Sequence, residues 1–377
     1  MTTTISDLVP IDGLGQDSVT GDLLASVGYA PETEVAATSI MVDHHYERSV
    51  SHDDRVVVMP ISDALVTYPW LQGLLFSLID PTSDETLRRA FDSTLRPLGT
   101  FTWVKPGAKL DKPLQSFSFM TVPQERQFSH DVTVIGEGAV VDCLSGDGVT
   151  PALTHGKHVS VSETFVGKNA QLRSLTVERF GREMDVHSYS ATRLDEGAVS
   201  SSVSVAVSGV ADHVAVSRSE LAAGAKESAH SVVFAPQGTH REMISVIDLQ
   251  GKGAQSEQVA RMVSDGGEIV NETTLIGSAD GVSGFLECDG LMLSPHGCID
   301  SVPALKARTD QAQLSHEASV GMVDVAKLDY LMATGMDDDA ARDLIVQGFL
   351  DLDEQELPAS LRSAVTDLVT AARAAEM

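Results

Sequence analysis

Small turn residues recur along the middle of this chain at a nearly constant spacing, and this repeat constrains the fold more than any other feature. The steps are 31, 28, 27 and 29 residues between the pairs Gly138-Ala139, Asn169-Ala170, Gly197-Ala198, Gly224-Ala225 and Gly253-Ala254. A fixed period of this length is typical of a solenoid, in which each coil returns the chain to the same edge. Neighbouring coils stack about 4.8 Å apart, which favours small residues at the turns.

The sequence between these turns alternates as β-strands do. Residues from about 115 to 310 are rich in Val, Ser, Thr, Ala and Gly, with runs such as Val203-Ser204-Val205-Ala206-Val207. Together with the repeat, this alternation predicts a mainly-β fold of the parallel β-helix type. A β-sandwich or a propeller is the alternative, although propeller blades are longer and more aromatic.

Helical patterns precede the strand-rich region. Apolar residues from Trp70 onward predict a helix that ends at Asp80-Pro81, and Ser83-Asp84 can cap a second helix. Residues 100–104 then predict a strand. We therefore expect residues 1–114 to form a mixed helical region before a β-helix core over 115–322.

The residue pattern changes from alternating to helical after the core. Asp324 can cap one helix that ends before Gly335, and Asp337 opens another. A third helix is expected from about Pro358 to Ala375. These residues, 323–377, form the third expected region, which can cover the end of the solenoid and dock a partner.

The charge of the chain excludes several functions. Its 26 Lys and Arg against 54 Asp and Glu give a net charge of −28, which repels nucleic acid and anionic membrane surfaces. A salt-rich cytoplasm and an ordinary acidic protein both remain open as explanations. The N-terminal residues lack the pattern of a signal peptide, no apolar run is long enough to span a membrane, and the three cysteines cannot form a disulfide framework. We expect a cytoplasmic location.

No catalytic signature is present, but one segment concentrates metal ligands. Phosphate-loop, nucleophile-elbow and zinc-protease motifs are all absent from the sequence, as is C-x-x-C. Residues 287–317 contain Cys288, Cys298, His316 and Glu317. Thiolate, imidazole and carboxylate suit iron, copper(I) and zinc, and coils of a β-helix can bring such residues together. A single cysteine in a strand rich in valine and leucine, such as Cys288, is more often a small buried hydrophobe.

Five segments resemble the SufB/SufD family, the scaffold proteins of the SUF machinery for iron–sulfur cluster assembly. They are 99–108 (GTFTWVKPGA), 234–240 (FAPQGTH), 287–294 (ECDGLMLS), 303–305 (PAL) and 314–321 (LSHEASVG). With residues 328–331 and 348–349 they cover about residues 65–352. The resemblance implies a right-handed parallel β-helix with an N-terminal helical region and C-terminal helices.

The resemblance also implies partners. Family members pair through the β-helix and bind SufC, an ABC-type ATPase, through the C-terminal helices, while sulfur comes from a cysteine desulfurase system. On this chain the helix residues expected to receive the ATPase are Leu328, Tyr330, Leu331, Leu344 and Phe349. The family partner is either a SufB/SufD paralogue or a second copy of this chain in a homodimer.

The family motifs map onto this chain with one displacement. The thiol position of SufB-like sequences falls on Gly297, and Cys298 is its neighbour, whereas His316 and Glu317 match the family's His and the SufB-type Glu. Ser315 and Val320-Gly321 resemble SufD instead, so the chain is a hybrid.

We therefore predict a non-catalytic scaffold subunit that carries a transient iron–sulfur cluster. Cys298 is the expected sulfur acceptor or iron ligand, His316 and Glu317 complete the site, and Cys288 is a weaker candidate. A SufD-like structural partner without its own cluster and a carbohydrate-active β-helix enzyme are the alternatives.

Overall fold

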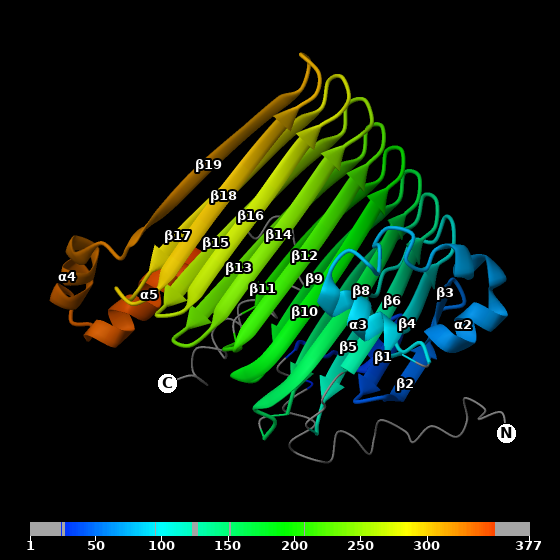
Figure 1. The fold of residues 1–377 in the computed structure, drawn as a ribbon, viewed down its shortest axis with the longest axis horizontal. Coiled ribbons are helices and arrows are strands. Elements are labelled where there is room, and N and C mark those ends of the chain that lie inside the picture. Colours follow the sequence, from blue (N-terminus) through cyan, green and yellow to red (C-terminus); the bar gives the residue numbers. More distant parts are fainter. Residues whose placement is uncertain are drawn as a thin grey trace.

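A parallel β-solenoid occupies most of the computed structural model, which describes residues 24, 27–94, 96–122, 127–150, 152–206 and 208–350. Successive strands alternate between two sheets, so that each coil adds one strand to each sheet (Figure 1). The mainly-β solenoid predicted from the turn repeat is confirmed. None of the described helices is long and apolar enough to cross a lipid bilayer.

Sheet A contains ten strands and sheet B nine. In spatial order, sheet A consists of β19 (Gln313–Met322), β17 (Ser283–Met292), β15 (Gln255–Asp265), β13 (Lys226–Pro236), β11 (Val199–Ala206), β9 (Gln171–Arg179), β7 (Val140–Val149), β5 (Leu114–Met120), β1 (Ala37–Val42) and β2 (His45–Ser51). Sheet B consists of β18 (Cys298–Ala307), β16 (Glu268–Gly277), β14 (His240–Leu249), β12 (Asp212–Leu221), β10 (Glu183–Leu194), β8 (His155–Val166), β6 (Gln127–Ile135), β4 (Thr100–Val104) and β3 (Val56–Pro60). All pairings are parallel except β1 with β2 and β3 with β4.

The predicted turn residues form one column along the solenoid. Gly138, Asn169, Gly197, Gly224 and Gly253 all have positive φ, between 54° and 70°. Each turn donates a backbone hydrogen bond to the next coil, as Gly224 N does to Lys252 O at 3.0 Å. Glycine and asparagine tolerate this left-handed conformation, which explains the residue types at the repeat.

The residue after each turn points into the core. All five alanines of the repeat, from Ala139 to Ala254, are completely buried. They pack with a leucine ladder in which Leu194 pairs with Leu221 and Leu221 with Leu249. The small alanine side chain lets this corner of each coil close tightly against its neighbours.

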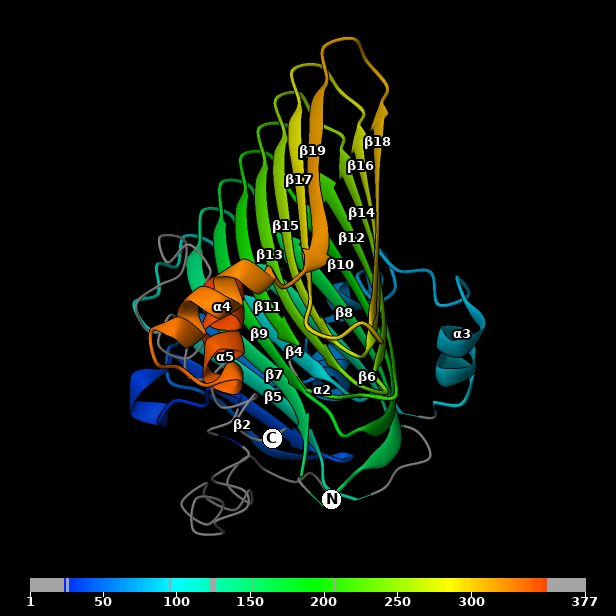
Figure 2. The same ribbon diagram turned by 90° about the vertical axis from the view of Figure 1, so that its left-hand side faces the viewer.

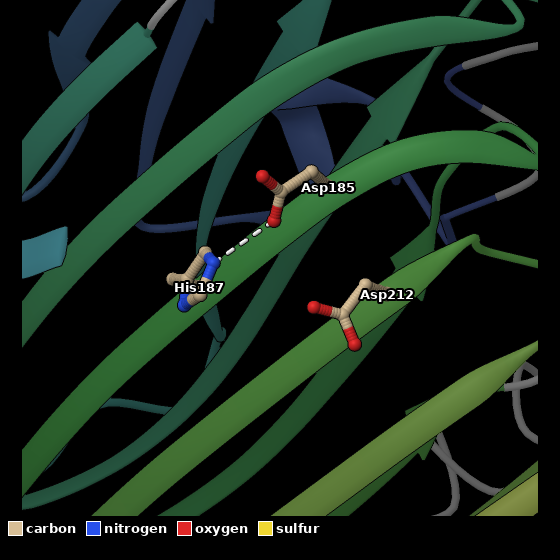
Figure 3. A group of neighbouring side chains, drawn as sticks. All are labelled: Asp185, His187 and Asp212. Atoms are coloured by element: carbon tan, nitrogen blue, oxygen red, sulfur yellow. Dashed lines mark ion pairs between the residues drawn. The ribbon is translucent and has the colours of Figure 1, made fainter.

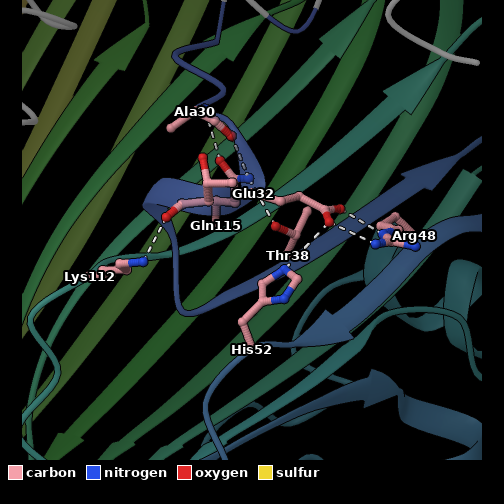
Figure 4. Close-up of polar contacts among 8 residues, drawn as sticks. Ala30, Glu32, Thr38, Arg48, His52, Lys112 and Gln115 are labelled. Atoms are coloured by element: carbon pink, nitrogen blue, oxygen red, sulfur yellow. Dashed lines mark hydrogen bonds and ion pairs between the residues drawn. The ribbon is translucent and has the colours of Figure 1, made fainter. Parts of the chain in front are cut away.

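The N-terminal end of the solenoid is closed by antiparallel strands. Beyond β5 the chain adds β1 and β2 to sheet A, and the short helix η3 (Glu32–Glu34) precedes them. Figure 4 shows how side chains fasten this segment: Glu32 accepts two hydrogen bonds from Arg48, both at 2.7 Å. Gln115 bonds to the backbone of Ala30 and to Thr38 Oγ1, each at 3.0 Å.

The helix predicted from Trp70 to Ile79 is wrong in its extent. The chain forms α2 (Ile61–Thr67) and the 3-10 helix η4 (Pro69–Gly73), and Phe76 has positive φ. The buried carboxylate of Glu163 accepts hydrogen bonds from the backbone N–H of Phe76 (2.6 Å) and Leu78 (2.7 Å). These backbone groups are therefore unavailable to a helix.

The other predicted helices agree better with the structure. Asp84 caps α3 (Glu85–Asp92), its side chain accepting from Leu87 N, and Asp324 caps α4 (Val325–Ala333). The last described helix is α5 (Asp338–Leu350). Figure 2 shows α4 and α5 on one side of the solenoid and α3 on the other. The helix predicted over 358–375 lies outside the described residues.

The alanine column gives a direct test of the coil stacking. We expect Ala225→Leu to lower the free energy of unfolding by about 1–3 kcal/mol, because the added methyl groups have no space between stacked coils. Urea denaturation followed by circular dichroism measures the change.

The matched control for this variant is Ala223→Leu, two residues earlier. Ala223 is exposed, so the control should stay within about 0.5 kcal/mol of the wild type. Equal stabilities of the two variants would contradict the packing account.

Candidate functional site

The C-terminal end of the solenoid exposes two strand edges. β18 and β19 end their sheets, and each has a neighbouring strand on one side only among the described residues. Both are ten residues long, and Val302, Val320 and Met322 are exposed there. Long exposed edges can pair with another chain, so this end is suited to contact with a partner.

Cys298 begins β18 on the outer face of sheet B. Its N–H donates to Gly267 O at 3.0 Å, and it pairs with Glu268 of β16. The thiol is exposed whereas the next residue, Ile299, is buried in the core. Desolvation, together with the carboxylates of Asp300 and Glu268, raises the pKa of Cys298. The free thiol is therefore protonated at neutral pH, and a bound cation would favour the thiolate.

Cys288 lies on the inner face of its sheet, in the space between sheets A and B. It is 3% exposed on β17, and its Sγ accepts a hydrogen bond from Asn271 Nδ2 at 3.4 Å. Burial raises the pKa of this thiol. The interpretation of Cys288 as a small buried hydrophobe fits these surroundings, because it packs with Ile269 and Ile299.

His316 and Glu317 lie on the edge strand β19, and both are exposed. His316 pairs with Leu286, which faces the interior, so its side chain lies on the inner side of sheet A. Glu317 pairs with Glu287 on the outer side. Glu287 is bound by Arg261 at 2.6 Å, and the same arginine also binds Asp289.

The structure does not bring the predicted ligands together within one chain. Cys298 belongs to sheet B and His316 to sheet A, and they face opposite sides of their sheets. Within the described ranges, the one group of three His, Cys, Asp or Glu residues with ligand atoms inside 4.8 Å of one another is Asp185, His187 and Asp212 (Figure 3). The sequence analysis missed this group, although the spacing of 27 residues between its aspartates follows the coil repeat.

A polar cavity lies between the two sheets. Its volume is about 500 Å³, and Ser and Thr side chains line much of it, with Cys288 near one end. Beside it, the fully buried Arg241 contacts His213 Nδ1 at 2.6 Å and Ser208 O at 2.7 Å, and Glu178 lies 3.8 Å away. Burial and the guanidinium lower the pKa of His213. Burial, with help from Glu178, raises the pKa of Asp147 in the cavity wall to about 8.

The five residues expected to receive a partner differ in exposure. Tyr330 is 70% exposed and Leu344 44%, whereas Leu328 is buried. Leu331 is half-buried, and Phe349 packs against the core of sheet A near Arg261. Leu328 and Phe349 therefore hold the helices in place, and Tyr330 and Leu344 remain free for contact.

These features define a class of protein: a β-solenoid with an open C-terminal edge, cysteine and histidine near that edge, and an appended helical pair. Residues 119–349 match the family model for the SufBD core domain, described as SUF system FeS cluster assembly. The chain belongs to the SufBD family of the SUF iron–sulfur cluster assembly system.

Curated relatives agree with this membership. An iron–sulfur cluster assembly SufBD family protein of Archaeoglobus fulgidus is 31% identical over 310 residues, which is 82% of this chain and 83% of the relative. One from Methanothermobacter thermautotrophicus is 28% identical over 351 residues, 90% of this chain and 84% of the relative. One from Pyrococcus horikoshii is 20% identical over 361 residues, 94% and 79% of the two chains.

The three cysteines should differ in reactivity. We expect iodoacetamide to modify Cys298 fastest in the folded protein, because Cys288 is buried and Cys143 is half-buried with a thiol pKa that desolvation raises to about 12. Peptide mass spectrometry after timed alkylation measures the three rates. The Cys298 rate should still be rising at pH 9, since its pKa lies above the usual value. Comparable labelling of Cys288 and Cys298 in the native state would contradict these environments.

Proposed function

We propose that this chain is a non-catalytic scaffold subunit on which the SUF system builds and transfers nascent iron–sulfur clusters. The observation that carries the proposal is the open end of the solenoid, where Cys298, His316 and Glu317 lie on the two terminal strands. Membership of the SufBD family, which belongs to the SUF system, supports this proposal. The cluster is cargo rather than a resident cofactor.

The cluster site in this proposal is completed by a second chain. The two exposed edges can pair with the same edges of another copy or of a SufB/SufD paralogue, which would extend both sheets across the interface. Ligands from two chains can meet there, whereas Cys298 and His316 of a single chain face different sides. Exposed Val302, Val320 and Met322 would become buried by this contact.

The chemistry follows from the ligand types. A cysteine desulfurase system would deliver sulfur to Cys298, and bound iron would favour the thiolate over the protonated thiol. His316 offers an imidazole and Glu317 a carboxylate, both of which bind iron. Cys288 is the weaker candidate, since reaching it requires entry into the space between the sheets.

Anaerobic reconstitution tests the proposed scaffold role. Incubation with ferrous iron and sulfide should give a visible cluster chromophore, and Cys298→Ser should lose most of it because a thiolate ligand is removed. Cys143→Ser is the matched control, since Cys143 lies far along the chain on β7, and it should keep the chromophore. Absorption spectra and bound iron per chain are the measurements.

One structural observation favours a second candidate, a SufD-like partner with no cluster of its own. Within the described residues the proposed ligands do not form a group in one chain. That candidate predicts no chromophore in any variant, combined with retained binding to a SUF ATPase. A chromophore in wild type and Cys298→Ser alike would contradict the role of Cys298 specifically.

The C-terminal helices form the proposed docking surface for a SufC-type ABC ATPase. Tyr330 and Leu344 are exposed apolar residues on neighbouring helices, and side chains of this kind anchor many interfaces. Asp337 and Asp338 add acidic groups beside them, which would suit a basic surface on the ATPase.

Substitution of the exposed pair tests this docking. We expect Tyr330→Ala and Leu344→Asp each to weaken binding of a SUF ATPase by about tenfold or more, as loss of an interface anchor does. Val66→Asp on α2 is the control, because Val66 is 81% exposed at the other end of the solenoid. Calorimetry measures the affinities, and equal loss in all three variants would contradict a docking surface on α4 and α5.

A further inference from the structure

A row of chemically active side chains crosses the outer face of sheet B. Its members occupy directly paired positions on six successive strands from β8 to β18: Lys157, Asp185, Asp212, His240, Glu268 and Cys298. The residues that follow three of them, Arg241, Ile269 and Ile299, are buried, so the row itself faces outward. Neighbouring strands lie about 4.8 Å apart, which makes the row continuous.

Two carboxylates stand side by side near the start of this row. Asp185 of β10 pairs directly with Asp212 of β12, and like charges in this position repel one another. Lys157 Nζ holds Asp185 Oδ2 at 2.6 Å, and His240 Nδ1 lies 2.6 Å from Asp212 Oδ1. Lys157 and His240 therefore hold the two carboxylates from the strands that flank the pair in the row.

His187 completes the group from the same strand as Asp185. Two residues along β10, it points to the same face, and its Nε2 lies 2.9 Å from Asp185 Oδ1 (Figure 3). Asp185 Oδ1 itself is shielded from solvent, although the Asp185 side chain is 40% exposed. Its contact with His187 lacks hydrogen-bond geometry, so this oxygen accepts no hydrogen bond from the described residues. A buried acceptor with no donor hydrogen aimed at it normally costs free energy, which makes the arrangement informative.

A metal ion would account for both the unsatisfied oxygen and the paired carboxylates. One ligand atom each from Asp185, His187 and Asp212 lies within 4.8 Å of the others. Bonds of about 2.1 Å put two neighbouring ligands of a six-coordinate ion about 3 Å apart, close to the observed 2.9 Å between His187 and Asp185. We propose that Asp185, His187 and Asp212 bind a divalent transition-metal ion.

The ligand types define which ions fit. One imidazole with two carboxylates suits Fe²⁺, Mn²⁺ and Zn²⁺, whereas Ca²⁺ requires a full set of oxygens and copper(I) prefers thiolate. Lys157 and His240 fix the carboxylates from behind, as the hydrogen-bonding partners of metal ligands do. The positive charge of the ion would also relieve the repulsion between Asp185 and Asp212.

The position of the site connects it to the proposed cluster chemistry. The row continues from Asp212 through His240 and Glu268 to Cys298 on the same outer face. Naming ferrous iron as the physiological ion rests on the proposed function, because iron would then bind along the surface that leads to the sulfur acceptor. The metal site itself does not depend on that function.

Cobalt titration tests the site independently of cluster assembly. The full chain carrying Cys298→Ser is titrated with Co²⁺ in excess Mg²⁺, which occupies the general acidic surface. We expect one equivalent of Co²⁺ with ligand-field bands in the visible region. His187→Ala and Asp212→Asn should each weaken this binding by at least about tenfold, since a ligand is lost.

The control variant is His155→Ala. His155 is an exposed imidazole at the start of β8, paired with Glu183 on the same face, and its loss should leave the affinity unchanged. Far-ultraviolet circular dichroism confirms that each variant folds, and the two ligand variants check one another. Absence of a stoichiometric visible band, or equal affinity of wild type and His187→Ala, would overturn the proposal. Because Cys298 is replaced throughout, this result is separate from the outcome of reconstitution.

Discussion

Backbone hydrogen bonding between successive coils is the constraint on which the rest of this structure depends. Residues on the inner strands of the solenoid lie beside residues about one repeat earlier and one repeat later, in register along both sheets. Side chains of one type therefore form rows, as the buried leucines and the turn residues do. The same geometry places Asp185 beside Asp212 and Glu268 beside Cys298, so residues that no local motif connects become neighbours in a row. A substitution in such a row acts on its neighbours in two other coils.

Coils could be added to such a stack without limit, so some other structural feature must end it at each end of the solenoid. At the N-terminal end the antiparallel strands β2 and β3 finish the two sheets, and Glu32, Arg48 and Gln115 fasten the segment that leads into them. At the C-terminal end α4 and α5 contact each other, and α5 packs beside β15, whereas β18 and β19 keep open edges among the described residues. Among the described residues β2 and β3 also have one free edge each, but they are seven and five residues long, against ten for β18 and β19. The longer parallel edges are the physical reason to expect a partner at β18 and β19.

The sequence predicted the features that repeat and missed those that depend on tertiary contacts. The period of Gly138, Asn169 and their equivalents defined the solenoid because a left-handed turn restricts residue type strongly. The helix expected to reach Ile79 failed because Glu163, more than eighty residues later, binds its backbone. The pairing of Asp185 with Asp212 was available in principle, since their spacing follows the turn repeat. The outward orientation of the Cys298 side chain could not be predicted, because it depends on β18 beginning at Cys298 rather than after it.

The sides on which the candidate ligands lie also limit how a cluster site could form. Cys298 is on the outer side of sheet B and His316 on the inner side of sheet A. A continuous sheet would keep such side chains apart, because its backbone stands between the two faces. Cys298 and His316 of one chain therefore stay on different sides of sheet B even when a partner strand continues the sheets. In the proposed function, each of them would have to meet ligands that a second chain brings to its own side. Pairing of the open edges and cluster binding would then be one event rather than two.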